Sequence, residues 1–345
     1  MKRKFVYILV AIFITIFGTF IIFKYVVNRN PLNVNVSKIN VETKLERLDK
    51  DLLLVSKEDP YKVITELQNK YGYFFELYNR EIIRIGSVEN SSYLVYLNTF
   101  LSDYAVYEAY KEVNRVFKNT DNLEKTMIDG FKHIKYYFPE KKLPRVVTFV
   151  AGFNQSIVIY EGFIGIGLDK YLGTDCKIYD MLQIPDYLRI EMTPEQIPID
   201  VVRAWVEYEF PYESETNYLI EYMIYNGRTL YFLDACYPNV KEEIKHKYTK
   251  KQLDYCYLYE REMWTRMVEQ KLIFNTDNVT IKKFIESAPF TSEFGPKSTP
   301  RTGNWIGYQI VKSYVKNNKI KIEDLMKEKD LMKILNKSGY NPKYR

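Results

Sequence analysis

Histidine is almost absent from this chain of 345 residues, which contains only His133 and His246. The two lie far apart in the sequence, and neither is near a second ligand at the spacing of a metal site. The zinc motif HExxH needs two histidines one helical turn apart with a glutamate beside the first. The sequence therefore excludes a zinc site of this kind, and we expect neither a metal nor a cofactor.

Cysteine is also scarce, with three residues at positions 176, 236 and 256. An odd number leaves at least one thiol unpaired or bonded between chains. No CxxC spacing suggests a metal, so we expect buried free thiols. Because the first cysteine is Cys176, this sequence has no N-terminal cysteine for a lipid anchor.

A sustained basic stripe is missing as well, although the net charge is +6. Five cations lie in the first 30 residues, which contain no acid: Lys2, Arg3, Lys4, Lys24 and Arg29. Subtracting these five from +6 leaves the remainder at +1. We therefore expect no nucleic-acid partner.

A long uncharged run is present near the N-terminus. Residues 5–23, "FVYILVAIFITIFGTFIIF", follow "MKRK" and are long enough to cross a bilayer as a helix. A cleaved signal peptide is the alternative, but the run exceeds a usual signal-peptide core and no small-x-small cleavage site follows it. We expect an uncleaved membrane anchor within residues 1–27, with the rest of the chain outside the cytoplasm.

Hydrophobic periodicity predicts an α+β fold. Residues 28–40 form a polar linker that shades into a short strand, and residues 41–345 form a single domain. That domain is helical over 41–140, carries a small sheet over 145–172 and is helical again over 193–345. Leu45 begins a helical pattern, and Asp59 caps a helix that starts at Pro60. Three further helices are expected at about 91–103, 104–118 and 121–138, and a hairpin turns near Glu161-Gly162.

Two helices in series, from Pro198 to Asp234, resemble the metal-binding helices of zinc peptidases. Pro211 ends the first helix at about Phe210, and the second is expected to end at Asn226-Gly227. Such helices carry HExxH on the first and a third ligand, often Glu before Gly, on the second.

Neither frame of the motif supplies a ligand here. With Glu207 as the base, the histidine positions are Val206 and Phe210. With Glu209 as the base, they are Tyr208 and Tyr212. The third-ligand position is Asn226, so the pair is a degenerate zinc-peptidase-like site.

Other catalytic motifs give little support. There is no GxSxG and no Walker phosphate loop, and Gly162, Gly165 and Gly167 belong to predicted strands rather than opening a helix. A pair of carboxylates for glycoside hydrolysis stays open among 44 acidic residues.

Several segments together resemble the gliding motility lipoprotein GldB family of Bacteroidetes, over about residues 40–345. The segments include "IPIDVVRAWVEYEF", "YMIYNGRTLYFLD" and "TPRTGNWIGYQIVKSYV". The resemblance implies a cell-envelope protein needed for gliding and for the secretion system that supports it. It also implies distant similarity to zinc peptidases whose ligands have been lost. Family lipoproteins carry an N-terminal lipidated cysteine, which is lacking here, so an inner-membrane anchor with the domain in the periplasm fits this sequence better than an outer-membrane lipoprotein.

Three hypotheses follow for function. The first is a non-catalytic envelope protein that binds an unknown envelope partner through the relic cleft. The second is an envelope hydrolase, a degenerate metallopeptidase or glycosidase, with an unrecognised site. The third places the partner site elsewhere, for example on the N-terminal helices. The candidate cleft residues are Arg203, Trp205, Glu207, Tyr222, Tyr225, Asn226 and Tyr231. Residue by residue, a packed core between the two helices is the better interpretation of the aromatic ones.

Overall fold

The computed structural model describes residues 30–343. The chain divides into two compact units, Met1–Asn35 and Val36–Arg345, and all elements named below belong to the second. The expected membrane anchor, residues 5–23, lies outside the described residues. Within residues 30–343, no helix is both long and apolar enough to cross a membrane.

Helices and a four-stranded sheet make up this second unit, which confirms the predicted α+β class. The strands are β1 (Leu45–Arg47), β2 (Arg145–Phe149), β3 (Ile157–Tyr160) and β4 (Phe163–Gly167). The helices before β2 are α2 (Leu48–Asp51), α3 (Pro60–Tyr71), α4 (Tyr73–Leu77), α5 (Tyr93–Ser102), α6 (Tyr104–Val116) and α7 (Asp121–Tyr137). Those after β4 are α8 (Lys177–Met181), α9 (Asp186–Arg189), α10 (Ile197–Glu209), α11 (Leu219–Cys236), α12 (Glu242–His246), α13 (Lys250–Leu258), α14 (Glu260–Glu269), α15 (Asn278–Ile285), α16 (Thr302–Asn318), α17 (Ile322–Lys327) and α18 (Leu331–Ser338).

The sheet has the order β1-β2-β4-β3. Strands β1, β2 and β4 run parallel, and β3 pairs antiparallel with β4. The β3–β4 hairpin turns where predicted, and Gly162 there takes a φ of 75° that favours glycine. The hairpin prediction is confirmed because period-two patterning and turn chemistry are local signals.

Strand β1 was not predicted. Residues 34–42, expected to shade into a strand, contain none, and the predicted helix from Leu45 begins instead with three strand residues. Leu45 pairs with Val146 of β2, about a hundred residues along the chain. A three-residue strand has too few positions to show period two, so its partner strand decides its conformation.

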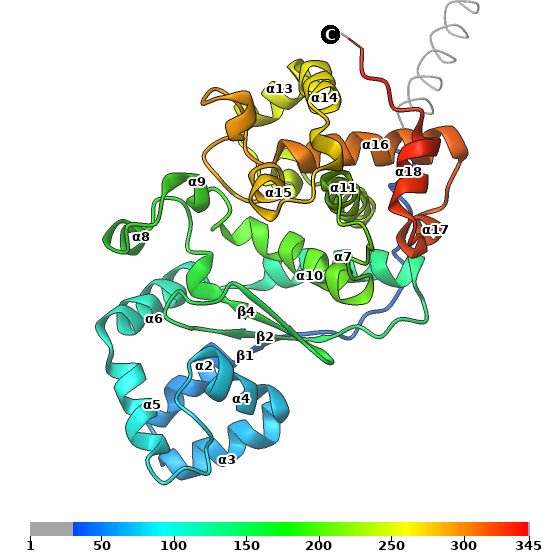
Figure 1. The fold of residues 1–345 in the computed structure, drawn as a ribbon. Helices are drawn as coiled ribbons and strands as arrows, with labels where there is room; N and C mark the ends of the chain where they lie inside the picture. The colour runs from blue at the N-terminus through cyan, green and yellow to red at the C-terminus, as the bar shows by residue number, and fades with distance from the viewer. Residues whose placement is uncertain (1–29, 344–345) are drawn as a thin grey trace, which may run out of the picture. The chain divides into compact units, whose positions relative to one another are not determined.

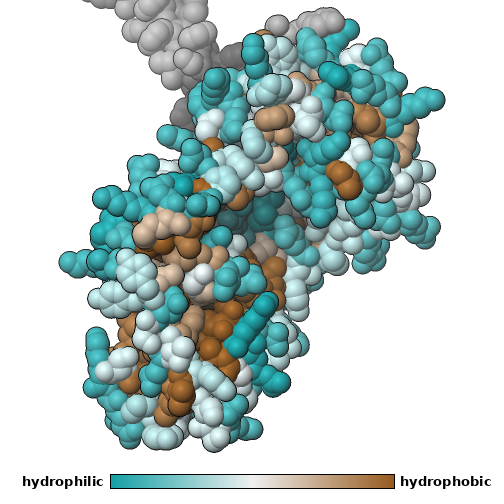
Figure 2. All heavy atoms as spheres, turned by 60° about the vertical axis from the view of Figure 1, so that its left-hand side comes forward, coloured by the Kyte–Doolittle hydropathy of each residue, from teal (hydrophilic) through white to brown (hydrophobic). Residues whose placement is uncertain are grey.

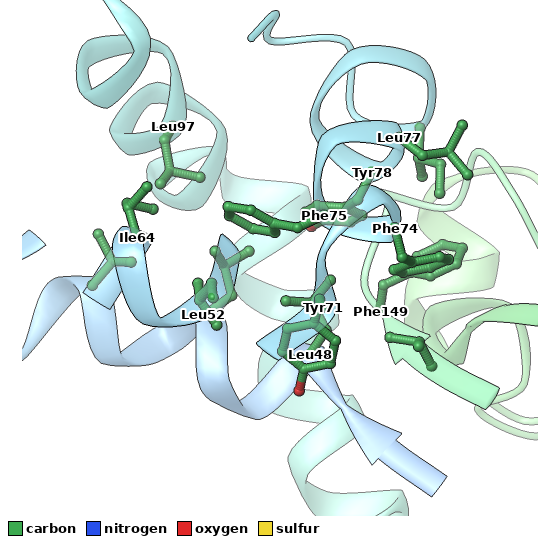
Figure 3. Packing of buried hydrophobic residues seen from close by; sticks show 14 of the residues in the cluster. Leu48, Leu52, Ile64, Tyr71, Phe74, Phe75, Leu77, Tyr78, Leu97 and Phe149 are labelled. Atoms are coloured by element: carbon green, nitrogen blue, oxygen red, sulfur yellow. The ribbon is translucent and has the colours of Figure 1, made fainter. Parts of the chain in front are cut away.

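A first hydrophobic core lies between the early helices and the sheet. Asp59 caps α3 by accepting a hydrogen bond from the Tyr61 backbone N–H at 3.1 Å, as predicted. Figure 3 shows side chains of α3, α4 and β2 meeting in this core. The Phe74 and Phe149 rings lie 6.3 Å apart, centre to centre, and both are fully buried.

A second layer of helices lies on the other side of the sheet, where α7 and α10 cover it (Figure 1). Trp205 of α10 is buried between Phe138, at 6.1 Å, and Phe232 of α11, at 6.0 Å. These aromatic contacts join α7, α10 and α11 into one packed layer.

Helices α11 and α16 cross at glycines. A β-carbon on Gly227 of α11 would lie 2.2 Å from the Gly307 carbonyl carbon of α16, and one on Gly307 would lie 1.7 Å from the Met223 oxygen. The backbones therefore touch where no side chain fits. The buried face of α16 includes Ile306, Ile310, Val311 and Tyr314, which follow one another at helical spacing.

Candidate functional site

Helix α10 turns a polar face away from its aromatic core contacts. Asp200, Arg203 and Glu207 follow one another at spacings of three and four residues, which places them on the same side of the helix. Trp205 lies on the other side, in the core.

A pocket of about 440 Å³ lies between this face and the helices that pack on α10. We call it the polar pocket, and it is lined by Glu191, Arg203, Asn226, Leu230, His246, Lys247, Tyr248, Ile285, Glu286, Ser287, Arg301 and Asn304. These residues come from α10, α11, the ends of α12 and α15, the start of α16 and the segment after α9. The face drawn in Figure 2 is hollowed near its centre, and the floor of the hollow is mostly hydrophilic.

Glu191 organises two of the cations in this pocket. It contacts Arg301, and one of its oxygens lies 3.3 Å from Lys247 Nζ. Burial alone would raise the pKa of this carboxyl, but the charges of Arg301 and Lys247, with hydrogen bonds, outweigh burial and lower it to about 2. Lys247 Nζ also lies 2.8 Å from Asp200, which accepts a hydrogen bond from the Tyr171 hydroxyl at 3.0 Å.

The same two cations have left-handed backbones. Lys247, just after α12, has a φ of 57°, and Arg301, just before α16, has a φ of 52°. The left-handed region costs a non-glycine residue roughly 1 kcal/mol or more. Both residues stand at helix ends, Lys247 as the C-cap of α12 and Arg301 as the N-cap of α16, so the helix ends that carry these two side chains also border the pocket.

Arg203 differs from these cations because no carboxylate oxygen among the described residues lies within the 4.0 Å of an ion pair. Its Nη2 donates one long hydrogen bond, of 3.3 Å, to the Lys245 carbonyl. Its Nε is buried and has no hydrogen-bond partner. Glu207 is exposed as a residue, but the protein around its carboxyl partly desolvates it and raises its pKa. The charge of Arg203 opposes this shift without cancelling it.

His246 is buried and uncharged. Burial, together with the positive charges of Lys245 and Arg203, holds the pKa of its imidazole well below the usual range. Its ring lies 4.7 Å from Tyr308 and 5.3 Å from Trp305, centre to centre. Among residues 30–343, no group of three or more His, Cys, Asp or Glu side chains is arranged to hold a metal ion.

Comparison with protein families identifies the chain. A model of the gliding motility protein GldB family matches residues 29–342. The chain belongs to this family. Searches of curated proteins and of solved structures each found no match. The predicted resemblance is thus confirmed over most of the chain, and membership makes this a cell-envelope protein related to gliding motility.

The structure separates the seven candidate cleft residues of this GldB family member. Arg203 and Asn226 line the polar pocket. Glu207 lies close enough to Arg203 for the guanidinium charge to act on the pKa of its carboxyl. Trp205 and Tyr231 do not line it, because Trp205 is core and Tyr231 is half-buried elsewhere on α11.

The two remaining tyrosines also lie outside the pocket. Tyr222 stacks on Tyr212 at 4.2 Å, and Tyr225 contacts the edge of Tyr212 at 5.4 Å. Tyr225 also lies under the Arg228 guanidinium, 5.3 Å from its ring centre. Tyr222 and Tyr225 thus belong to a separate aromatic cluster around Tyr212 and do not line the polar pocket.

The predicted end of the second helix is wrong. Asn226 and Gly227 lie in the middle of α11, which continues to Cys236. Gly227 has no positive φ and instead permits the close crossing with Gly307. Gly227 is therefore a site of close backbone approach and not a helix cap.

The side of α10 that faces the pocket is not the side that carries the histidine positions in either tested frame of the HExxH motif. Arg203 and Glu207, one turn apart, share the side on which Asn226 meets α10, whereas Val206 is fully buried in the core. Sequence reasoning missed Glu191, Lys247, Arg301 and Asn304, which reach the pocket from distant segments. Only Arg301 and Asn304 belong to a segment that carries the family resemblance, "TPRTGNWIGYQIVKSYV".

Proposed function

We propose that this GldB family member is a non-catalytic envelope protein that binds a partner protein through the polar pocket. In this role it supports gliding motility or the associated secretion machinery. The observation that carries the proposal is Arg203, a cation without an ion pair among the described residues, in the wall of a pocket that Asn226 also lines. The charge of Arg203 on α10 would repel a divalent cation, while the pocket of about 440 Å³ leaves room for a ligand.

The proposal includes the location of the domain. The uncharged run at residues 5–23, preceded by Lys2, Arg3 and Lys4, supports an inner-membrane anchor with the domain in the periplasm. In this arrangement the polar pocket faces envelope partners rather than cytoplasmic ones.

Site-specific crosslinking in cells tests partner binding. A photoreactive amino acid replaces Asn226 in the pocket or, as a control, Tyr61, which is 75% exposed on α3. We expect one discrete adduct from position 226. A second variant, in which a larger side chain fills the pocket, tests whether the partner enters it. Leu230→Trp, which fills the pocket, should remove an adduct formed from a crosslinker at the rim residue Glu286.

The functional arm uses the same blocking variant. A strain whose only copy carries Leu230→Trp should lose colony spreading or secretion while the protein keeps its wild-type level and melting temperature. Normal spreading and secretion with the pocket filled would refute partner binding at this site.

The hydrolase hypothesis is separated by a metal analysis. Protein purified without added metal should contain far less than one zinc per chain. Stoichiometric zinc, together with peptidase activity that a chelator abolishes, would replace the binding role with catalysis.

A further inference from the structure

Arg203 has hydrogen-bonding capacity that the protein does not use. A guanidinium carries five N–H donors, and the structure engages one of them, in the long bond to the Lys245 carbonyl. The buried Nε has no partner. Leaving a buried cationic donor unpaired is unfavourable unless a ligand completes it.

Asn304 supplies an unused acceptor in the same pocket. Its Nδ2 donates to the Ile285 carbonyl at 3.0 Å, and because a carbonyl only accepts, this bond fixes the orientation of the amide. The Oδ1 atom is consequently the one that is buried without a partner. A ligand that satisfies both side chains must offer an acceptor to Arg203 and an N–H to Asn304.

The field in the pocket favours a negative ligand at Arg203. Lys247 and Arg301 are already paired with Glu191 and Asp200, so they add little repulsion or attraction of their own. Helix α16, seventeen residues long, starts at the pocket wall and directs the positive end of its dipole there.

Two other carboxylates, Glu286 and Glu207, lie near the pocket and could in principle pair with Arg203. Glu286 at the rim is exposed and pairs with Lys282 at 3.7 Å. Glu207 is exposed and stays beyond ion-pair distance from Arg203. Neither therefore occupies the buried Nε of Arg203.

We infer that the polar pocket binds the C-terminal end of a peptide chain, with Arg203 holding the terminal carboxylate and Asn304 accepting from an adjacent backbone N–H. The last residue of a peptide places these two groups side by side, and Leu230 and Ile285 offer an apolar wall for its side chain. Arginine suits a carboxylate because its fork can donate two parallel hydrogen bonds. The inference rests on the proposed function and specifies which part of the partner enters the pocket.

Affinity selection with peptide mixtures tests the inference. The purified full-length chain is incubated with N-acetylated hexapeptides of random sequence, either with free carboxylates or as C-terminal amides. We expect enrichment from the free-carboxylate mixture alone. Peptides enriched in this way should bind at least about tenfold more weakly as amides, which corresponds to about 1.4 kcal/mol.

Matched arginine variants identify the residue. Arg203→Gln should weaken peptide binding by about tenfold or more. Arg203→Lys keeps the charge but loses the two parallel donors of the guanidinium, so its affinity should lie between those of Arg203→Gln and the wild type. Arg115→Gln is the control, because Arg115 is exposed and pairs with Glu112 away from the pocket. Melting temperatures of all three variants report whether the fold is intact.

The inference is overturned by equal enrichment from both mixtures, by no enrichment from either, or by wild-type binding in Arg203→Gln. Selection of internal Asp or Glu side chains, with no effect of amidation, would also overturn it by assigning the carboxylate to a side chain. Loss of the cellular adduct in the pocket-filling variant, combined with one of these results, would leave the proposed function standing. The reverse pattern, peptide binding without a cellular partner, would leave the peptide site and remove the function.

Discussion

Asp169 is a buried carboxylate that forms no ion pair with any of the residues 30–343. It is fully buried at the end of β4, where one oxygen accepts hydrogen bonds from the backbone N–H groups of Ala151, at 3.2 Å, and Phe153. The other oxygen has no partner. Burial outweighs these hydrogen bonds and raises the pKa of the carboxyl to about 6.

Stability should therefore decrease as pH rises through this range. Because the folded pKa exceeds the ordinary value of 3.8, the stabilising contribution is complete below that value and is lost as pH rises through about 6. Asp169→Asn, which cannot ionise, should lose this dependence and gain on the wild type by up to about 3 kcal/mol between pH 4 and pH 8. Urea unfolding of both proteins across this range measures the difference, and parallel curves would contradict the prediction.

Glu191 should show the opposite pH dependence. Its folded pKa of about 2 lies below the ordinary value of 4.5, so its contribution is present above 4.5 and is lost as pH falls through about 2. Glu191→Gln leaves Arg301 and Lys247 without their shared carboxylate and should destabilise the protein by about 3 kcal/mol at pH 7.

Chemical unfolding at pH 7 and at pH 3 checks the Glu191 prediction, because the difference between wild type and variant should shrink at the lower pH. Glu58→Gln, which changes an exposed glutamate, is the control and should match the wild type at both values. A constant difference would mean that the side-chain amide disturbs packing rather than charge.

At the scale of elements, the crossing of α11 and α16 is the contact that holds the pocket walls together. Asn226 and Leu230 lie on α11 and Asn304 lies on α16, on either side of the Gly227–Gly307 approach. A second glycine on α16, Gly303, is packed against the Phe284 carbonyl, which a β-carbon would approach to 2.9 Å. The separation of the two helices therefore sets the width of the pocket.

Gly227→Ala gives a prediction whose sign is diagnostic. In an unconstrained helix interior, alanine would stabilise by about 1 kcal/mol over glycine. Here the added methyl group would clash with the Gly307 backbone, so we expect a destabilisation of about 3 kcal/mol or more. Gly307→Ala should behave in the same way, and the effects of the two substitutions should not add, because each forces the same separation.

Thermal and urea unfolding measure both glycine variants. A Gly227→Ala protein at least as stable as the wild type would contradict the close approach. The same variants should also weaken the binding of any ligand in the polar pocket, since Asn226 and Asn304 would move apart.

At the scale of the whole molecule, the uncharged run before the folded unit predicts how the chain partitions. The protein should stay in the membrane fraction in high salt and leave it with detergent, since an apolar helix is retained by hydrophobic burial rather than by charge. Fractionation followed by immunoblotting checks this. Release by salt alone, or a mature N-terminus mapped beyond residue 25, would show instead a peripheral or cleaved protein.

The sequence by itself determined those elements whose signals are local. Asp59 and Pro60 start α3 because a cap and a fixed φ act within one turn. The β3–β4 hairpin follows from alternation and a glycine turn. All three cysteines are buried and free, as their small number and spacing predict. Family membership was also available from the sequence, because it rests on segments that keep their order along the chain.

Tertiary structure alone decided what depends on distant partners. Leu45–Arg47 became a strand because β2 offered unpaired backbone groups, against a helical pattern of leucines. Helix α11 continued through Asn226 and Gly227 because packing against Gly307 outweighs the weak helix propensity of glycine. The polar pocket collects Glu191, Lys247 and Arg301 from three separate segments, so the pairing that leaves Arg203 without a carboxylate exists only after folding. Local propensities act over a few residues, whereas contact and charge pairing act through space, and the candidate site depends on the second kind.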